Sequence, residues 1–424
     1  MAVAEKMSPL RAILICVNSM IGAGLFINTK PLTNLAGSCG FLGYVIAAVI
    51  LVPLILCIAE LAALHPVAGG LYVYSRTHVG SWAGFFSSWA YFVGKTTSVA
   101  ILMHKFIEYF YVRVNILQSV PLFALDCLML FVLVFLNSAG IAVGGRVQYL
   151  FSTLKAIPIF FAFGLGFAYF NVSNFGDICG LQDILCTVPI AIFPLLGFEV
   201  ICSIGNMIED SARNIKRVII TSFVVVAIID VTFQLTTFGI LGYELGNANE
   251  PILALGMKAL SSYPILASTI NGAVFASIIG ACFSIMTSNC WNLHTIARNG
   301  HLPGGNFLMR INRNNVPWVS LSIEALLGCV VLFISVDQVP LQNMAVFAQI
   351  VSYFITALAA WYAVQSGALK KLSSLMPFFA VGSCAFIMGI CLQRIITFGV
   401  SLPFLLLFIT GIAAALYKRF VCAH

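Results

Sequence analysis

The sequence predicts an all-α integral membrane protein with about twelve transmembrane helices. Hydrophobic residues make up 61% of the 424 residues and charged residues only 8%, whereas a soluble domain carries roughly a quarter charged residues. Because one span needs about 20 apolar residues, we expect short loops and no soluble domain. The positive charges behind the net charge of +7 are scattered along the chain, so we expect no nucleic-acid partner.

Apolar stretches place the spans along the chain, and basic residues orient them. Most lysines and arginines fall on one side of the expected membrane, whereas Arg113, Lys258 and Arg394 fall on the other. The positive-inside rule then puts both termini in the cytoplasm. The expected spans are 10–36, 41–64, 82–112, 120–139, 147–171, 184–208, 217–243, 264–293, 317–336, 342–366, 375–393 and 400–420.

The first span is predicted to be broken in its middle. Residues 13–26 are apolar, but Gly22 and Gly24 interrupt them just after Asn18 and Ser19. Each glycine weakens a helix interior by roughly 1 kcal/mol relative to alanine. Backbone groups freed by a break are tolerated at membrane depth only inside protein or beside a watery cavity. The pattern is typical of a transporter site, although a glycine notch for close helix packing would also produce it.

The sixth span carries a second interruption, at Pro194 and Gly197. Paired interrupted segments at corresponding positions of two halves are the best sequence pointer to a transporter's binding site. The pair of breaks therefore favours transport over a packing role.

Charged groups inside predicted spans are costly and mark candidate functional residues. Glu199 follows the second break, where we expect it to titrate a proton or to contact a cation. Lys155 is expected midway along the fifth span, where two roles stay open, coupling or a static bridge to the carbonyl ends of the broken first helix. Lys95, in the third span, likewise has a functional and a structural interpretation.

The remaining intramembrane carboxylates are expected to be structural. Glu60 lies near the cytoplasmic end of the second span, where it would snorkel or pair with a loop arginine. Asp126, Asp230 and Glu324 fall at peripheral or end-of-span positions by the boundaries above.

Most of the thirteen cysteines lie in apolar segments without a C-x-x-C pair, as expected of small core residues. A disulfide between Cys179 and Cys186 is an alternative. The sequence shows no metal-ligand set, phosphate loop or nucleophile–base arrangement, so we expect no enzyme, no cofactor and no metal site.

Four motifs occur in order along the first three quarters of the chain. They are IGAGLF at 21–26, AELAALHPVAGGLY at 59–72, GFE at 197–199 and ARNGHLP at 297–303. They resemble the first-span G-x-G, the A-E-L-x-x-x-x-P-x-A-G-G-x-Y, the G-F-E and the A-R-D-G-x-L-P motifs of the amino acid–polyamine–organocation (APC) transporter superfamily.

The resemblance implies a LeuT-like fold working by alternating access. Inverted five-helix repeats, roughly 10–171 and 184–366, would form a transport core over 1–366, and 367–424 would add two helices. The resemblance also implies coupling by Glu199 and Lys155. The implied substrate site comprises Ser19, Met20, Gly22, Ala23 and Gly24 at the first break, Phe193, Gly197 and Phe198 at the second, and Tyr91, Lys95, Ile285 and Ser288 as walls.

The chain is similar above all to the basic amino acid/polyamine antiporter branch, which includes arginine/agmatine exchangers, through its size and the pattern around Arg146 and Pro158. It departs from that branch at three places. Lys155 resembles a lysine of proton-coupled members, Phe193 and Ile285 stand where the exchangers carry tryptophan, and Asp210–Arg213 replaces the loop motif N-P-x-R.

We therefore expect a sodium-independent amino acid permease of the cell (plasma or inner) membrane, either proton-coupled or exchanging amino acids or amines. The alternatives are a strict arginine/agmatine-type antiporter, a non-transporting sensor, and a channel. Expected partners are a small amino acid or amine, protons and membrane lipid, with a homodimer left open.

Overall fold

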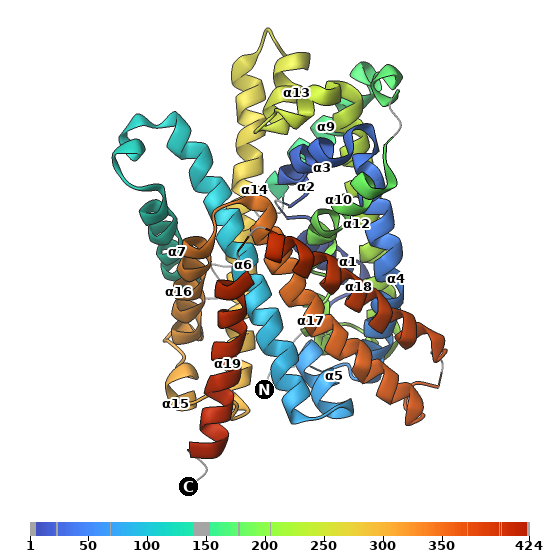
Figure 1. Cartoon of the computed structure of the whole chain (residues 1–424), viewed down its shortest axis with the longest axis vertical. Coiled ribbons are helices and arrows are strands. Elements are labelled where there is room, and N and C mark those ends of the chain that lie inside the picture. The colour runs from blue at the N-terminus through green and yellow to red at the C-terminus, as the bar shows by residue number, and fades with distance from the viewer. Residues whose placement is uncertain are drawn as a thin grey trace.

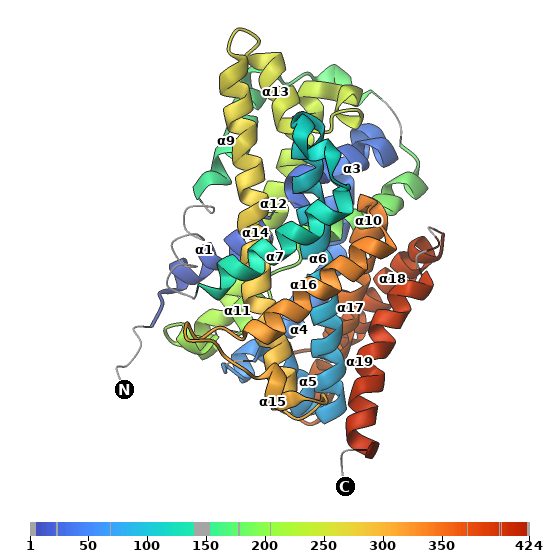
Figure 2. The same cartoon turned by 90° about the vertical axis from the view of Figure 1, so that its left-hand side faces the viewer.

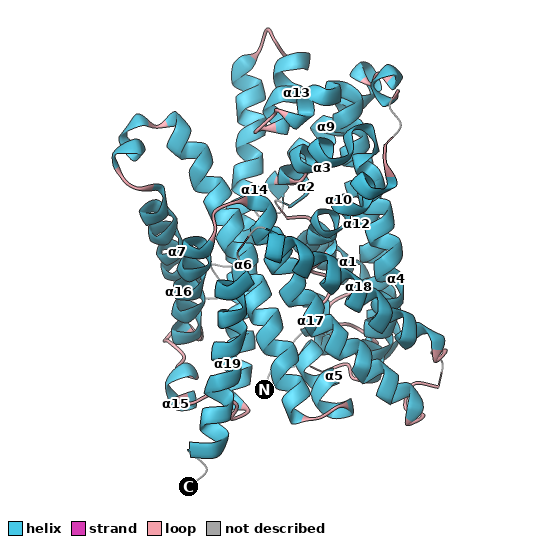
Figure 3. Ribbon diagram, viewed as in Figure 1, coloured by secondary structure: helices cyan, strands magenta, loops and turns pink. Residues whose placement is uncertain are grey.

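The computed structural model describes residues 6–22, 24–67, 69–139, 153–176, 179–203, 205–370, 372–397, 399 and 401–421. Within these ranges the chain is a bundle of helices joined by short loops (Figure 3). Seven helical segments are long and apolar enough to cross a membrane, and four further apolar helices are shorter. The all-α expectation is confirmed, and each expected span contains a helix, but a total of twelve crossings stays a prediction. Residues 140–152, at the start of the fifth expected span and including Arg146, lie outside the described residues.

The α-helices are α1 (Pro9–Met20), α2 (Gly24–Ile27), α3 (Thr29–Ala36), α4 (Gly40–Leu64), α5 (Gly70–His78), α6 (Ser81–Arg113), α7 (Leu122–Ser138), α9 (Ala156–Tyr169), α10 (Leu181–Leu195), α11 (Val200–Ser203), α12 (Ser211–Leu241), α13 (Pro251–Ala259), α14 (Pro264–Arg298), α15 (Gly305–Leu308), α16 (Trp318–Ile334), α17 (Gln338–Gln365), α18 (Leu375–Thr397) and α19 (Ser401–Val421).

The long helix α6 lies at the centre of the bundle. It packs against α17 and α14, while α4 packs against α12 and α18 packs against α17. The short helix α13 lies at one end of the bundle, and α5 and α15 lie at the other, where α19 stops (Figure 1, Figure 2). We refer to these as the α13 end and the α5 end. Helix α18 packs against α17 and α4, whereas α19 packs against α6, and both lie on one flank of the bundle in Figure 2.

Two helical segments are interrupted where the sequence predicts it. Helix α1 ends at Met20 and α2 begins at Gly24. Helix α10 ends at Leu195, Leu196 is extended with φ −82° and ψ 148°, and α11 begins at Val200. The predicted breaks are confirmed, so the first and sixth spans are not continuous helices.

Pro194 explains part of the second break. A proline within a helix has no N–H to donate to the carbonyl four residues earlier, which here is that of Ile190. The Asn28 side-chain amide, between α2 and α3, donates to this carbonyl at 2.8 Å. Asn28 therefore satisfies the group that Pro194 leaves free, and it joins the two interrupted segments.

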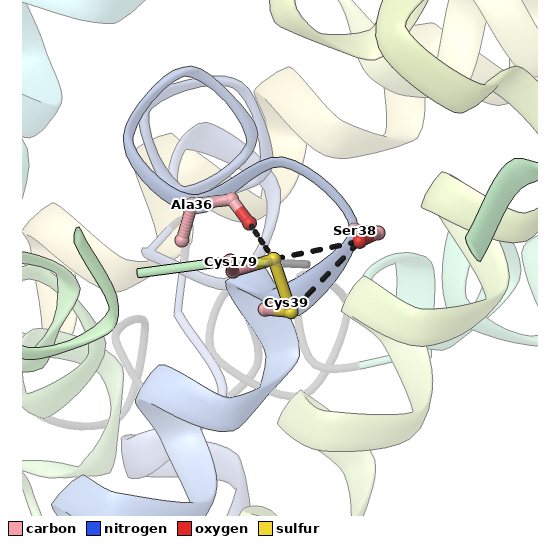
Figure 4. The surroundings of a disulfide bond; sticks show 4 residues. All are labelled: Ala36, Ser38, Cys39 and Cys179. Carbon is pink, nitrogen blue, oxygen red and sulfur yellow. Dashed lines mark hydrogen bonds between the residues drawn. A yellow bond between two sulfur atoms is a disulfide. The ribbon is translucent and has the colours of Figure 1, made fainter. Parts of the chain in front are cut away.

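A disulfide joins Cys39, at the end of the 3₁₀ turn η1 (Gly37–Cys39), to Cys179, just before α10 (Figure 4). Their Cα atoms are 6.2 Å apart, within the usual range for a disulfide. The alternative pairing of Cys179 with Cys186 is therefore wrong, and Cys186 is free. Cys186 lies inside α10, whereas the turn after α3 brings Cys39, 140 residues away in sequence, to Cys179.

Candidate functional site

A small cavity of about 60 Å³ lies where the two helix breaks meet. A single water needs roughly 10–15 Å³ of such space, so the cavity has room for a few waters but not for an amino acid in this conformation. Most of the residues predicted for the site line it together. These are Ser19, Met20, Gly22, Gly24, Lys95, Lys155, Phe193, Gly197, Ile285 and Ser288.

Glycines allow the two breaks to approach each other closely. Gly197 has φ +125°, and a Cβ there would lie 3.2 Å from the Ser19 carbonyl oxygen. A Cβ on Gly24 would lie 3.0 Å from the Phe193 ring. The Ser19 hydroxyl donates to the carbonyls of Cys16, at 2.9 Å, and Gly197, at 3.1 Å. The interrupted segments are therefore in direct contact, and any bulkier residue would separate them.

Glu199 does not line the cavity, but its carboxylate has four polar partners beside the second break. It forms an ion pair with Lys95 at 2.9 Å. It also accepts hydrogen bonds from the hydroxyls of Tyr91, at 2.9 Å, and Tyr353, at 2.6 Å, and from the Gly197 amide at 2.9 Å. This buried cluster holds the second break against α6 and α17, and the cation contact expected of Glu199 is Lys95.

Two features of this cluster could not be deduced from the sequence. Tyr353, on α17, lies 154 residues from Glu199, and nothing in its apolar surroundings distinguishes it. The Gly197 amide is occupied by the Glu199 carboxylate, so this peptide group is not available to a ligand in this conformation.

Lys155 lies at the end of α1. Its ammonium donates to the carbonyl oxygens of Asn18, at 2.5 Å, and Ile21, at 2.9 Å. Cations are favourable at a helix C-terminus, where carbonyls lack intrahelical partners. Lys155 precedes α9 as its N-cap residue, and its side chain also lines the cavity. The bridge to the broken first helix therefore exists, and the same contact leaves a coupling role open.

Two other predicted site residues, Phe198 and Tyr91, do not line the cavity. Phe198 is fully buried and packs against Tyr353 and Phe223, with ring centroids 5.5 and 6.4 Å apart, so its side chain is not part of the cavity wall. Tyr91 contacts Glu199 and does not line the cavity. Ala23 lies outside the described residues.

The peripheral placement of Asp126, Asp230 and Glu324 is wrong. All three are buried, with at most 1% of their surface exposed. Asp126 pairs with His104 at 2.8 Å, and Glu324 accepts from the Asn289 amide at 2.9 Å. Hydropathy boundaries do not reveal which face of a helix meets a neighbour, and these faces meet other helices.

Glu60 and Asp230 differ in their pairing. Glu60 pairs with Lys216 of α12 rather than with a loop arginine. Neither carboxyl oxygen of Asp230 has a hydrogen-bond partner within the described part of the chain.

Sequence comparison relates the chain to amino acid permeases and transporters. The family model described as amino acid permease matches residues 11–414. An uncharacterized transporter of Mycobacterium tuberculosis is 28% identical over 305 residues, covering 70% of this chain and 67% of that protein. The gamma-aminobutyric acid permease of Bacillus subtilis is 22% identical, covering 72% and 67%. The Asc-type amino acid transporter 1 of Mus musculus is 24% identical, covering 84% and 70%. The chain belongs to the amino acid permease family of the APC superfamily.

Proposed function

We propose that the chain is a secondary active permease that binds a small zwitterionic amino acid between the two helix breaks and releases it by alternating access. The observation that supports this most is the cavity at the junction of the breaks, lined by backbone and small polar side chains. Interrupted helices at a polar cavity are a device by which transporters hold polar substrates. The present cavity of about 60 Å³ is too small for an amino acid, so binding requires the surrounding helices to move apart.

The charges of the site favour a zwitterion over a cation. Lys95 and Lys155 both line the cavity, and the Glu199 carboxylate already pairs with Lys95. A guanidinium or polyamine would therefore meet two ammonium groups and no free carboxylate among the described lining residues. Phe193 and Ile285 offer less aromatic surface than the tryptophans of arginine/agmatine exchangers. These features disfavour the strict antiporter for basic amino acids.

Lys155 is the proposed coupling residue, and it makes transport independent of sodium. Its ammonium already contacts the carbonyls at the end of α1, which is where the resemblance implies that sodium-driven relatives hold their ion. Loss of the Lys155 proton would leave these carbonyls without a charged donor and would free α1 to move. Amino acid exchange without net proton movement is the second coupling mode to be tested.

We propose that the α13 end faces outward and that both termini are cytoplasmic. The distribution of basic residues supports this orientation, and so does the Cys39–Cys179 disulfide near the α13 end, because disulfides form in oxidising compartments. The two breaks occupy corresponding positions in the proposed repeats 10–171 and 184–366, with α18 and α19 outside the repeats.

Proteoliposomes containing the purified protein provide the test. We expect saturable counterflow of small neutral amino acids and, with a pH gradient, concentrative uptake. Lys155→Ala should abolish the concentrative uptake and retain binding. Lys258→Ala is the matched control, because Lys258 also donates to a backbone carbonyl, that of Ile240 at 2.6 Å, but does not line the cavity.

Three results would contradict the proposal. Flux that rises linearly with concentration would indicate a channel. Binding without counterflow would indicate a sensor. Unchanged pH-driven accumulation by Lys155→Ala would remove Lys155 from coupling.

A further inference from the structure

Asp230 is a buried carboxylate that the transport site described above does not use. It lies on α12, none of its surface is exposed, and it does not line the central cavity. Neither of its oxygens has a hydrogen-bond partner within the described part of the chain. A buried polar group without a partner is rare in folded proteins and needs a reason, so Asp230 is a candidate for a function of its own.

Two contacts fix the register of α4 against α12. Near one end of the pair, Glu60 of α4 forms an ion pair with Lys216 of α12. Near the other end, a Cβ on Gly40 of α4 would lie 3.3 Å from the side-chain nitrogen of Gln234 of α12. Since the numbering rises along one helix while it falls along the other, the two helices are antiparallel.

This register places Tyr44 opposite Asp230. Tyr44 lies one helical turn after Gly40, and Asp230 lies one turn before Gln234. Both side chains are fully buried, and the Asp230 carboxyl acts electrostatically on the Tyr44 hydroxyl. That hydroxyl, like the Asp230 oxygens, has no hydrogen-bond partner among the described residues. The α4–α12 interface therefore contains a carboxyl group without a donor to stabilise its ionised form.

No cation among the described residues faces Asp230. Helix α12 packs against α4, α1 and α9, and less extensively against α3, α10, α13 and the 3₁₀ turn η5 (Gly242–Gly246). The basic residues of α12 itself lie in its first two turns. The cations of the neighbouring elements donate to oxygen atoms elsewhere or are exposed; they are Lys30, Lys155, Lys258 and Arg11. The carboxylates of these elements are paired or exposed; they are Glu60, Asp183 and Glu244.

An unpaired charge in such surroundings would not persist. An isolated ionised carboxylate in an apolar interior is so unfavourable that the group takes up a proton instead. Asp230 is therefore neutral as long as the interface between α4 and α12 stays closed. Entry of water would remove this constraint, because a hydrated carboxyl group ionises at neutral pH.

The same interface contacts the first interrupted helix. Gln234 donates to the hydroxyl of Thr33, on α3, at 3.2 Å. Tyr44 lies beside the side chain of Asn28, which joins the two interrupted segments. Binding of an amino acid requires the helices around the central cavity to move apart, and a movement of α3 would open the surroundings of Asp230 to water.

We propose that Asp230 is a proton-binding site of the transport cycle. Its carboxyl takes up one proton from water when its surroundings are open to one side of the membrane and keeps it while α3, α4 and α12 stay packed. It returns the proton to water on the other side, so the O–H bond is the one bond that forms and breaks. Each cycle then carries one proton through Asp230 in addition to any proton exchanged by Lys155. The transport step rests on the proposed function, whereas protonation of Asp230 does not.

The steady accumulation of alanine in proteoliposomes counts the coupled protons. In a pH gradient without a membrane potential, removing one coupled proton lowers the limiting inside-to-outside ratio of alanine about tenfold per pH unit. We expect this decrease for Asp230→Asn, because the asparagine amide resembles the protonated carboxyl and lets the cycle continue with one proton fewer. The limiting ratio does not depend on the amount of active protein, so a lower yield of folded variant does not imitate the effect.

Glu324→Gln is the matched control. Glu324 is also a buried carboxylate, but it accepts from the Asn289 amide and lies on α16, which packs against α7, α6 and α14. This variant should keep the wild-type ratio. A ratio that is unchanged in Asp230→Asn, or equally lowered in both variants, would overturn the proposal. Uptake that requires sodium or potassium in the wild type but not in Asp230→Asn would also overturn it, since a metal ion would then take the place of the proton.

Infrared spectroscopy of the purified protein detects the proton without transport. An exposed aspartate is ionised at about pH 7. At that pH, the difference spectrum between the wild type and Asp230→Asn should contain the carbonyl stretch of a protonated carboxyl. Absence of this band, with intact accumulation by the wild type, would overturn the Asp230 site and leave the proposed function in place. A wild type that does not accumulate alanine in a pH gradient would overturn proton-coupled transport, and the role of Asp230 in it, whatever the spectrum shows.

Discussion

Gly197→Ala tests whether folding and transport require the interruption between α10 and α11. Gly197 has φ +125°, a region that residues with a Cβ rarely adopt. An alanine Cβ would also lie 3.2 Å from the Ser19 carbonyl oxygen and 3.3 Å from Met20 Cα. Both neighbours are backbone atoms of the first interrupted segment, so neither moves aside as a flexible side chain would.

Two costs add at this position. Backbone strain of this kind costs about 1–3 kcal/mol, and overpacking a close contact costs about 1–3 kcal/mol. We therefore expect Gly197→Ala to lower the free energy of unfolding by about 2–6 kcal/mol, or to separate the two segments and abolish transport.

Gly164→Ala is the matched control. Gly164 lies inside α9, and a Cβ there meets nothing within 4 Å. Alanine is favoured over glycine in a helix interior by about 0.5–1 kcal/mol, so this variant should be as stable as the wild type or slightly more stable. Thermal unfolding in detergent and alanine counterflow measure both variants. Equal melting temperatures and equal counterflow for the two variants would refute the argument from strain and contact.

Three further predictions concern groups outside that contact. Lys95→Met should lower the free energy of unfolding by about 3–5 kcal/mol, because it leaves Glu199 buried and unpaired. Adding Glu199→Gln should recover part of this loss in a double-mutant cycle, and strict additivity would argue against the pair. Burial lowers the pKa of His65 and of His78 below 6.5, and His65 lowers the pKa of His78 further. The unfolded chain then binds more protons, so these histidines should make stability fall as pH drops below about 6.5. His78→Gln should weaken that dependence in melting curves between pH 5 and 8, and an unaltered dependence would exclude the pair as its source. Asp230→Leu should leave the melting temperature unchanged or raise it, since neither carboxyl oxygen has a hydrogen-bond partner in the described chain. A clear decrease would show that the carboxyl stabilises the fold.

The helix breaks could be predicted from the sequence because their causes are local. Gly22 and Gly24 weaken one helix, and Pro194 removes a backbone donor from another; both effects are intrinsic to the residue types. The four motifs indicated the protein family and the general location of the site. Ten of the predicted residues accordingly line one cavity.

The pairings could not be predicted because they depend on which helix faces meet. The sequence marks Lys95 and Glu199 each as an unusual intramembrane charge, but only the packing of α6 against the second break brings them to 2.9 Å. The burial of the Phe198 side chain away from the cavity could not be predicted for a related reason. Gly197, with its positive φ, interrupts the helical periodicity, so the direction of the next side chain cannot be read from spacing along the chain.

The disulfide could not be predicted either, because it also depends on how distant segments of the chain pack. Cys179 and Cys186 are near each other in sequence, but Cys186 is fixed inside α10. Cys39 reaches Cys179 only because α3 turns at η1, a feature with no local signal linking the two cysteines.

Hydrogen–deuterium exchange with and without saturating alanine tests the central claim most directly. If the interrupted segments bind the amino acid, exchange should slow at residues 19–26 and 193–200, and the slowing should be lost in Gly197→Ala but not in Gly164→Ala. Alanine binding at the same concentration with unchanged exchange in both segments would contradict the account.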